Sequence, residues 1–193
     1  DLYRLKISVV AAHCNFHLRA AESDRDETFV RDLCRQYGVV LHVCHFHTTQ
    51  YAAEQGISIE MAAREQRYSW LEQLRQDNRC QYIAVAHHSN DQAETLLLNI
   101  RRGTGIRGLC GMRPKNGNIV RPLLCLTRQQ IADYAEQQHL KHVEDSSNTD
   151  LSFKRNEIRR QLSHYSAADI RHISHTADLM QGYVNIIDSY ISQ

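Results

Sequence analysis

The stretch that decides the fold is Ala86-His-His-Ser-Asn-Asp-Gln-Ala-Glu-Thr95, which follows an apolar run and precedes a segment of helical apolar spacing. This pattern predicts a strand end that leads into a helix start. In open α/β sheets, ligands bind outside the carboxyl ends of the strands, and a helix N-terminus at that edge offers free backbone N–H groups to phosphate. His87 and His88 therefore stand at a candidate site. Asp91 followed by Glu94 also fits a helix capping box, in which both carboxylates are structural.

Two further strands are predicted upstream, and each leads to histidines. Residues 5–12 lead to His13 and His17, and residues 39–46 lead to His47. Both runs are rich in β-branched and apolar residues, which is typical of buried parallel strands. Because the carboxyl ends of parallel strands meet at one edge of a sheet, we expect these histidines to gather near one site.

Helix signals fill the segments between the strands. The acidic run 23–26 predicts the start of a helix, and Gly38 predicts its end. Ser58 is a predicted N-cap for a helix over 59–77, because the apolar residues that follow recur at helical spacing.

The alternation of strands and helices predicts an α/β fold with a parallel, doubly wound sheet. Such sheets usually have about five strands, so we expect an opening strand and the loop after it to precede residue 5. We divide the chain into a domain over 1–162 and a long linking helix over 163–193. The apolar residues of that helix form a heptad seam, which packs on a following domain, on the chain's own core or on a second copy. The seam comprises Ile170, Ile173, Ala177, Met180, Val184, Ile187 and Ile191.

Composition limits the class of protein. The chain has 193 residues, a formal net charge of +1 and a pI near 7.8, so only local clusters of charge argue for a nucleic-acid partner. No apolar run is long enough to span a membrane and no signal peptide is recognisable, so we expect a soluble cytoplasmic protein without membrane contact. The six cysteines occur singly, without a Cys-x-x-Cys pair.

Several loop and turn signals follow the central stretch. Residues 103–111 contain four glycines in nine positions, which taken alone indicate a flexible turn more than a ligand loop. Residues 115–118 predict a hairpin turn, and Thr127 with Gln130 predicts a capping box. In the segment 154–160, four of seven residues are cationic, which indicates either a solvated helix face or contact with phosphate.

Six blocks of this sequence, in order over residues 12–160, resemble the tRNA(Ile)-lysidine synthetase family. The blocks are Ala12-His-Cys-Asn-Phe-His17 with Leu18-Arg19 and Glu22-Ser-Asp24, Ile59 to Tyr68, His87 to Thr95, Arg102 to Met112, Arg121-Pro-Leu-Leu124, and Asp145-Ser-Ser-Asn148 followed by Arg155-Asn156.

The resemblance implies a ligase of the PP-loop class of ATP pyrophosphatases, with a Rossmann-like sheet of the adenine-nucleotide alpha-hydrolase type. It implies that ATP adenylates carbon 2 of the wobble cytidine in the CAU anticodon of tRNA(Ile), that L-lysine then attacks, and that AMP leaves to give lysidine. The cofactors implied are ATP and Mg²⁺, and the partners are tRNA(Ile) and L-lysine.

The resemblance also implies roles for individual residues. Ala12, His13 and His17 are expected against ATP. The expected catalytic residues are His87, His88, Asp91 and Arg155. The expected lysine, cytidine or tRNA contacts are Arg64, Gly105, Arg107, Gly108, Arg155 and Asn156. From chemistry alone, Asp91 is a hard oxygen ligand suited to Mg²⁺, and Glu94 lies one helical turn further on the same face.

Two departures from the family pattern stand out. The Ser-Gly-Gly-x-Asp-Ser phosphate loop does not occur in this sequence, and we expect its place before residue 5. Where the family commonly has two adjacent aspartates, this chain has Asn90-Asp91, which puts in doubt any role that needs the first carboxylate.

Three other functions compete with the lysidine synthetase hypothesis. A PP-loop tRNA thiolase would use a similar adenylate, although the absence of Cys-x-x-Cys pairs counts against it. A non-catalytic protein that forms a homodimer through its heptad seam is a second alternative. A zinc module is the third, and its candidate ligands are His13, Cys14, His42, Cys44, His45 and His47.

Overall fold

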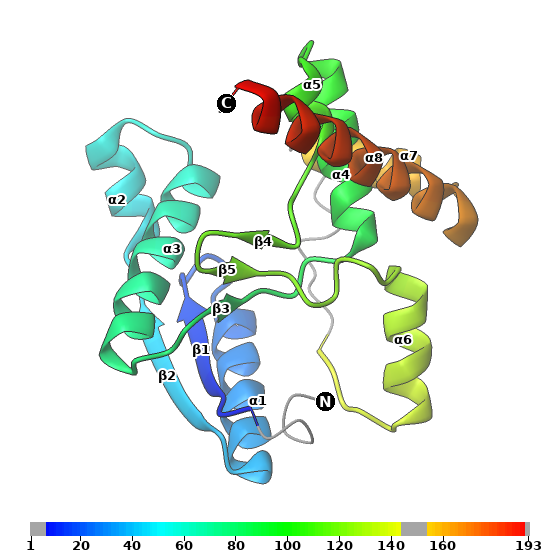
Figure 1. Cartoon of the computed structure of the whole chain (residues 1–193). Helices are drawn as coiled ribbons and strands as arrows, with labels where there is room; N and C mark the ends of the chain where they lie inside the picture. The colour runs from blue at the N-terminus through cyan, green and yellow to red at the C-terminus, as the bar shows by residue number, and fades with distance from the viewer. Residues whose placement is uncertain (1–6, 144–153, 192–193) are drawn as a thin grey trace. The chain divides into compact units, whose positions relative to one another are not determined.

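The structure, a computed structural model, describes residues 7–143 and 154–191 (Figure 1). The chain divides into two compact units, residues 1–83 and residues 84–193. This division differs from the one drawn at residue 162 from the sequence, because the long C-terminal helix packs within the second unit. Each unit is described by itself.

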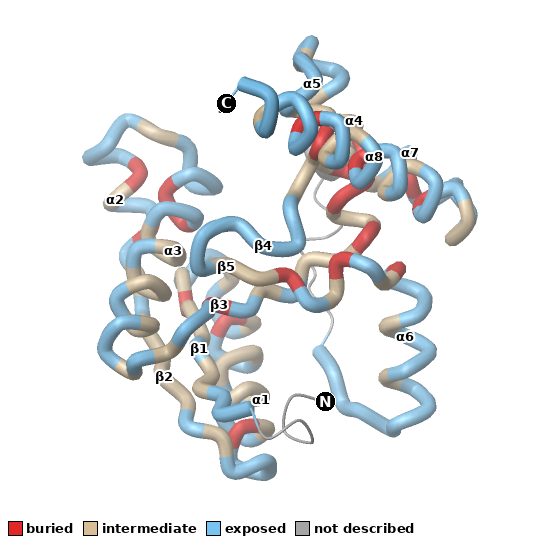
Figure 2. Tube along the Cα trace, viewed as in Figure 1, coloured by how far each residue is buried: buried red, intermediate tan, exposed pale blue. Residues whose placement is uncertain are grey.

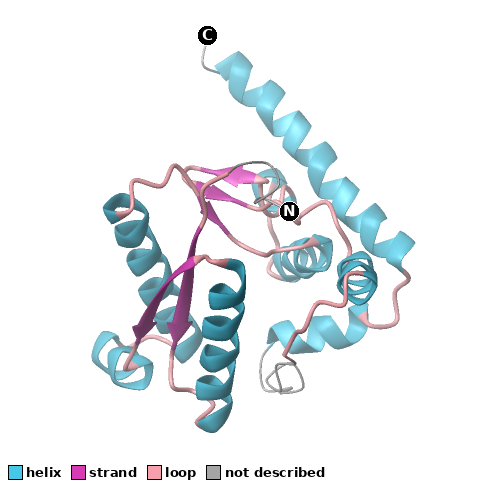
Figure 3. Cartoon of the chain, turned by 90° about the horizontal axis from the view of Figure 1, so that it is seen from below, coloured by secondary structure: helices cyan, strands magenta, loops and turns pink. Residues whose placement is uncertain are grey.

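The first unit contains a parallel pair of strands, β1 (Val10–Asn15) and β2 (Val40–His45), joined by α1 (Ala21–Tyr37). Figure 3 shows α1 running alongside the two strands. The pairing is in register from Val10 opposite Val40 to Asn15 opposite His45. Gly38 ends α1 in the left-handed conformation, with a φ of 63°. The α/β class, the second strand and this helix end are therefore confirmed.

Two boundaries in the first unit differ from the prediction. β1 begins at Val10 and not at residue 5, because its length is that of the six-residue strand with which it pairs. His13 consequently lies inside β1 and not beyond its end. Helix α1 begins at Ala21, so Ser23 lies inside it, where its Oγ accepts a hydrogen bond from the Arg19 N–H at 3.3 Å.

Helices α2 (Thr48–Gln55) and α3 (Ile59–Asp77) follow β2 and pack against each other. Ser58 caps α3 as predicted, because its Oγ accepts a hydrogen bond from the Met61 N–H at 3.2 Å. The buried residues of the two helices are small, with Ala52 on α2 and Ala62 on α3 at 4% and 0% exposure. Small side chains allow helices to approach closely.

A three-stranded sheet has the order β3-β5-β4. Its strands β4 and β5 belong to the second unit, and β3 spans the boundary at residues 83 and 84. β4 (Lys115–Asn116) and β5 (Ile119–Val120) form the predicted hairpin, with Gly117 at a φ of 58°. β3 (Ile83–Ala84) is only two residues long, and the backbone next to it continues the pairing, since the Val85 N–H donates to the Val120 carbonyl at 3.0 Å.

The structure pairs β3 with β5 of the hairpin. The alternation of strands and helices predicted the class of the sheet but named no partner for the 82–86 strand. Strand pairing depends on segments far apart in sequence, and periodicity alone does not select the partner.

Five helices complete the described part of the second unit. They are α4 (Ser89–Arg101), α5 (Ile106–Leu109), α6 (Arg128–Gln137), α7 (Lys154–Leu162) and α8 (Ala167–Ile191). The core joins Ala93 of α4, Ile158 and Leu162 of α7, and Ile170 of α8. Figure 2 shows the buried positions along these three helices.

Helix α8 packs against α4 and α5, so the first part of its heptad seam serves the core of its own unit. Ile170, Ala177 and Val184 are each no more than 2% exposed, whereas Ile187 and Ile191 at the end of the seam are 43% and 76% exposed. None of the helices in the described ranges combines the length and the apolar character needed to cross a membrane.

Candidate functional site

The start of α4 is organised by His88 and Asp91. His88 is the N-cap residue, and its backbone N–H donates to the Asp91 Oδ2 at 2.9 Å. The His88 Nδ1 lies 3.5 Å from the same oxygen. A carboxylate in the first turn of a helix is also stabilised by the helix dipole. Asp91 therefore takes part in a helix cap. The N-cap residue is His88 and not Asp91, so the cap lies one turn earlier than the spacing of Asp91 and Glu94 predicted.

The residues between His88 and Asp91 fasten this helix start to the rest of the second unit. The Ser89 N–H donates to the Leu126 carbonyl at 2.9 Å, and the Ser89 carbonyl accepts from the Ser174 Oγ at 3.0 Å. The Asn90 Oδ1 accepts from the Arg128 N–H at 2.9 Å. Asn90 thus has a structural use that an amide supplies as well as a carboxylate. These bonds hold the two adjacent histidines in a fixed place.

Glu94 has a different environment from Asp91. Its side chain is 6% exposed, and its Oε1 accepts a hydrogen bond from the Arg159 Nε of α7 at 2.8 Å. An arginine that neutralises a buried carboxylate competes with a metal ion for the same oxygens. This geometry argues that Glu94 joins α4 to α7, and that Asp91 is the better candidate for Mg²⁺.

The glycine-rich loop is anchored to α4 by two side chains. The Gln92 Nε2 donates to the Met112 carbonyl at 3.0 Å, and the Gln92 Oε1 accepts from the Met112 N–H at 2.6 Å. The Asn99 Nδ2 donates to the Gly108 carbonyl at 2.8 Å. Gly111 has a φ of 56°, and a Cβ there would lie 2.6 Å from the Gln92 Oε1. The side chains of Gln92 and Asn99 therefore fix the conformation of this loop, which is more than the flexible turn that its glycines alone indicated.

The predicted substrate residues of this loop lie on or beside the short helix α5. Gly105 is its N-cap and Gly108 lies within it, where an added Cβ would overlap Thr104. Arg107 donates two hydrogen bonds to Asp188 of α8, from Nη2 to Oδ1 at 2.6 Å and from Nη1 to Oδ2 at 3.2 Å. Pairing with Asp188 raises the pKa of Arg107 above its ordinary value. In this structure Arg107 binds the C-terminal helix.

In the first unit, a small pocket of about 90 Å³ lies beside the end of β1. Its lining residues are His13, Cys14, Asn15, Phe16, Leu18, Arg19, Ser23 and Asp26. His13 thus forms part of the wall, whereas its neighbour Ala12 is exposed and, by the alternation of a strand, points to the other face. Burial lowers the pKa of His13, although Glu27 and Asp26 act in the opposite direction. Burial therefore favours the neutral form of the His13 ring.

His17 pairs with a histidine that the sequence did not single out for ATP. The His45 Nδ1 lies 2.9 Å from the His17 Nε2, and the two rings stack with centroids 5.0 Å apart. The His45 Nε2 lies 3.5 Å from the Glu27 Oε2. Asn15, only 1% exposed, donates to the same oxygen at 2.9 Å and accepts from the His17 N–H at 3.0 Å. Asn15 was not predicted as a site residue. Its position as a polar residue at the end of an apolar strand is the sequence feature that could have indicated it.

The two arginines of α3 contact different rings. The Arg64 Cζ lies 4.8 Å from the ring centroid of Tyr68, which belongs to the same helix. The Arg67 Cζ lies 5.3 Å from the ring centroid of Phe16, directly after β1. Of the two, Arg67 is the one placed beside the end of β1, although the sequence assigned Arg64 to the substrate.

Metal-ligand geometry removes one alternative. Within residues 7–143 and 154–191, no three His, Cys, Asp or Glu side chains come together in a way that holds a metal ion. The zinc module predicted from His13, Cys14, His42, Cys44, His45 and His47 is therefore wrong, and all six of these residues are described.

Some predicted site residues lie outside the described part of the chain. The Asp145-Ser-Ser-Asn148 block falls between residues 144 and 153. Arg155 and Asn156 belong to α7, but their side chains are not described. Their predicted roles stay predictions.

The chain is similar to known proteins over most of its length. A family model described as the PP-loop domain matches residues 2–165. The tRNA(Ile)-lysidine synthase of Bacteroides thetaiotaomicron is 57% identical over 152 residues, which are 79% of this chain and 36% of that protein. The synthase of Chlorobaculum tepidum is 38% identical over 183 residues, 91% of this chain and 55% of that protein.

A solved structure supports the same fold. The U34-tRNA thiolase NcsA from Methanococcus maripaludis superposes with a TM-score of 0.71 at 18% identity, covering 93% of this chain and 66% of the thiolase chain. At that identity the likeness concerns the fold alone. The chain spans about a third of the length of the first curated relatives. Because the family model covers most of the sequence, the chain belongs to the PP-loop domain family.

Proposed function

We propose that this chain is part of an ATP-dependent ligase that joins L-lysine to carbon 2 of the wobble cytidine of tRNA(Ile) with a CAU anticodon. The observation that carries the proposal is the start of α4, where His88 and Asp91 are fixed at a helix N-terminus of the kind that binds phosphate. The relatives that are tRNA(Ile)-lysidine synthases, at 57% and 54% identity, indicate the substrates.

The proposed reaction has two steps. The oxygen on carbon 2 of the cytidine attacks the α-phosphorus of ATP, and pyrophosphate leaves. An amine of L-lysine then attacks carbon 2, the bond to the oxygen breaks, and AMP leaves with that oxygen. Charge develops on phosphate oxygens in the first step, so positioned N–H donors and cations lower its barrier.

The proposal assigns roles to residues of each unit taken by itself. His87 and His88 bind the phosphate oxygens, and Asp91 presents a carboxylate for Mg²⁺, which also takes phosphate oxygens and water as ligands. His13 and His17 contact the nucleotide, whereas Ala12, which points to the other face of β1, has no role in this proposal. Arg155 and Asn156 contact the activated cytidine or the tRNA. The lysine, the cytidine or the tRNA is also contacted by Gly105, Arg107 and Gly108 in the second unit and, separately, by Arg64 in the first.

The decisive experiment uses the full-length protein with ATP, labelled lysine and tRNA(Ile). Label transferred to the tRNA, with AMP formed in equal amount, supports the proposal. The matched control is the same tRNA with the wobble cytidine replaced by uridine, which should stay unlabelled. Transfer of sulfur from a labelled donor in place of lysine would support the thiolase alternative, which shares the fold. Sedimentation of the same sample measures whether a second copy is a partner.

A further inference from the structure

Two histidines of the first unit meet where β1 and β2 end. The His45 Nδ1 lies 2.9 Å from the His17 Nε2, and the two ring planes are inclined by only 18°. Two ring nitrogens approach this closely when one carries a hydrogen and the other a lone pair, because two N–H groups repel each other and so do two lone pairs. The hydrogen bond between the rings therefore has one of two directions.

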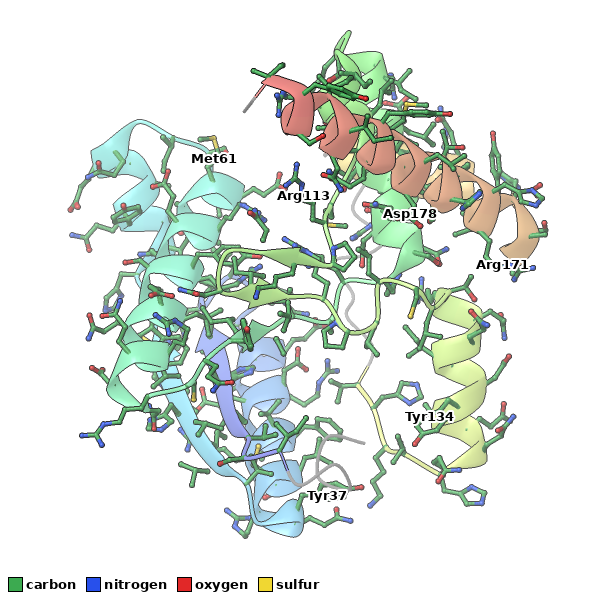
Figure 4. The ribbon with its side chains drawn as sticks, in the orientation of Figure 1. Tyr37, Met61, Arg113, Tyr134, Arg171 and Asp178 are labelled. Atoms are coloured by element: carbon green, nitrogen blue, oxygen red, sulfur yellow. The ribbon has the colours of Figure 1, made fainter. Side chains whose placement is uncertain are left out.

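Glu27 favours one direction of this hydrogen bond. It belongs to α1, the helix whose last residue, Tyr37, is labelled in Figure 4. The Glu27 Oε2 lies 3.5 Å from the His45 Nε2, the ring nitrogen that does not face His17. A carboxylate accepts hydrogen bonds and donates none, so it favours a hydrogen on the His45 Nε2. In the neutral His45 ring the Nδ1 is then the acceptor, and the His17 Nε2 is the donor.

The Glu27 carboxylate is held in its charged form and in one orientation. Burial raises the pKa of Glu27, but the hydrogen bonds from Asn15 and Arg31 outweigh that effect and lower the pKa below its ordinary value. The Asn15 Nδ2 donates to Oε2 at 2.9 Å, and the Arg31 Nη2 donates to Oε1 at 2.7 Å. Each carboxylate oxygen thus has a donor from the protein, and Oε2 stays directed at His45.

The backbone of His17 is held by the same asparagine. His17 has a φ of 52°, in the left-handed region that favours glycine. Its N–H donates to the Asn15 Oδ1 at 3.0 Å, and Asn15 is only 1% exposed. Non-glycine residues persist in this conformation where their surroundings fix them, and they are frequent at ligand sites. One buried amide therefore fixes both ends of the chain of contacts from Glu27 to His17.

The second nitrogen of His17 is the one that a ligand can reach. His17 is exposed, and no hydrogen bond within residues 7–143 and 154–191 includes its Nδ1. With the hydrogen on Nε2, the Nδ1 of the neutral ring is an acceptor. An acceptor repels phosphate oxygens and binds N–H or O–H groups. In a nucleotide such groups belong to the nucleoside part, as the amino group of adenine and the hydroxyls of ribose.

We propose that Glu27 and His45 are positioning residues that hold His17 as a hydrogen-bond acceptor for the nucleoside part of ATP. That the ligand is ATP rests on the proposed function. The hydrogen bond made by one nitrogen of a histidine decides whether its other nitrogen donates or accepts. The contacts from Glu27 through His45 thus select which groups of the nucleotide His17 binds.

Nuclear magnetic resonance of the full-length protein, labelled with nitrogen-15 in its histidines, measures the hydrogen bond directly. At a pH about two units above the ordinary histidine pKa of about 6.5, the rings are neutral. A scalar coupling between the His45 Nδ1 and the His17 Nε2 is expected, with the hydrogen on the His17 Nε2. A missing coupling, or a hydrogen on the His45 Nδ1, overturns the proposal.

Variants of His45 measure the effect on nucleotide binding. His45→Phe keeps a flat ring for the stack but has no acceptor, so the Kd for ATP should rise about two- to tenfold, the range for one hydrogen bond. His45→Gln supplies a carbonyl that accepts from the His17 Nε2, and it should restore most of the affinity. His164→Phe, at an exposed histidine of the second unit, is the control and should leave the Kd unchanged.

Equal Kd values for His45→Phe and His45→Gln refute the positioning role. Circular dichroism shows whether both variants fold, and if either does not, the coupling in the unsubstituted protein decides.

Nucleotide analogues identify the group that His17 binds. ITP has a carbonyl oxygen in place of the adenine amino group, and 2′-deoxy-ATP and 3′-deoxy-ATP each lack one ribose hydroxyl. The analogue without the contacted donor should bind about two- to tenfold more weakly than ATP, and this difference should disappear in His17→Phe. If His17→Phe leaves the penalty of every analogue unchanged, His17 binds none of these groups and the proposal is wrong.

None of these measurements needs tRNA, lysine or turnover, so their failure and the failure of the proposed function are distinguishable. A protein that labels tRNA but lacks the hydrogen bond between the two rings loses only this proposal. A protein that binds ATP through His17 but labels no tRNA loses only the ligase.

Discussion

The ion pair between Glu94 and Arg159 predicts an asymmetry between its two single variants. Glu94 is 6% exposed at its side chain, whereas Arg159 is 36% exposed. Arg159→Gln removes the guanidinium that donates to this buried carboxylate, and removing one partner of a buried pair costs about 3–5 kcal/mol. Glu94→Gln leaves an arginine that water reaches, so the loss is about 1–3 kcal/mol, as for a hydrogen bond to a charged group.

Urea unfolding followed by circular dichroism measures the free energy of unfolding of both variants and of the double variant. The double variant should be more stable than Arg159→Gln, because it also removes the buried charge of Glu94. The expectation is that Arg159→Gln destabilises more than Glu94→Gln by at least about 1 kcal/mol. Equal losses, or a larger loss for Glu94→Gln, would refute the structural role.

The same variants separate the structural role of Glu94 from its predicted metal role. If Glu94→Gln abolishes ATP-dependent tRNA labelling while the free energy of unfolding is unchanged, the carboxylate is needed for chemistry and the argument from the ion pair is wrong. Arg159→Gln is the control, because it disturbs the same contact without removing a carboxylate.

Three further predictions concern stability. Gly111→Ala should lower the free energy of unfolding by more than Gly117→Ala does, because both glycines have a positive φ but only Gly111 lies against Gln92. The left-handed backbone alone costs about 1–2 kcal/mol in each variant. Thermal melts of the two variants measure the difference, and equal melting temperatures would contradict the contact with Gln92. Ser58→Ala should cost about 1 kcal/mol through loss of the α3 cap, and Ser58→Thr should restore it; equal melting of the two variants would contradict the cap. The lowered pKa of His13 means that the folded state disfavours protonation of this ring. Its contribution to stability is therefore complete above the unfolded pKa of about 6.5 and declines as the pH falls through the lower folded pKa. Urea unfolding from pH 7 to pH 5 should show a flatter decline for His13→Asn, and an unchanged slope would contradict this role of His13.

The features that were predicted correctly from the sequence depend on local signals. Ser58 and the helical spacing after it predicted α3 over 59–77, and the structure has the helix at those residues. Thr127 and Gln130 form the predicted capping box of α6, with the Thr127 N–H donating to the Gln130 Oε1 at 2.9 Å. A cap involves residues three apart, so its geometry depends on little beyond the helix start.

The sequence pattern predicted where the candidate site lies, but not the contacts between side chains that form it. The sequence placed His88 and Asp91 at a helix start, and the structure has them there. It did not predict that His45 stacks on His17, that Arg67 lies over Phe16, or that Asp188 binds Arg107. Each of those pairs joins two separate elements. His17 and His45 are 28 positions apart in the sequence, and Arg107 and Asp188 are 81 positions apart.

The sequence by itself determined the α/β class, the capped starts of α3 and α6, and the helix start near His88, because each depends on neighbours within one turn or one strand. Only the tertiary structure decided that β3 pairs with β5, that Glu94 binds Arg159 and that Arg107 binds Asp188. The physical reason is that pairing and burial are set by groups brought together from distant parts of the chain, and a residue's type does not state which group it will meet.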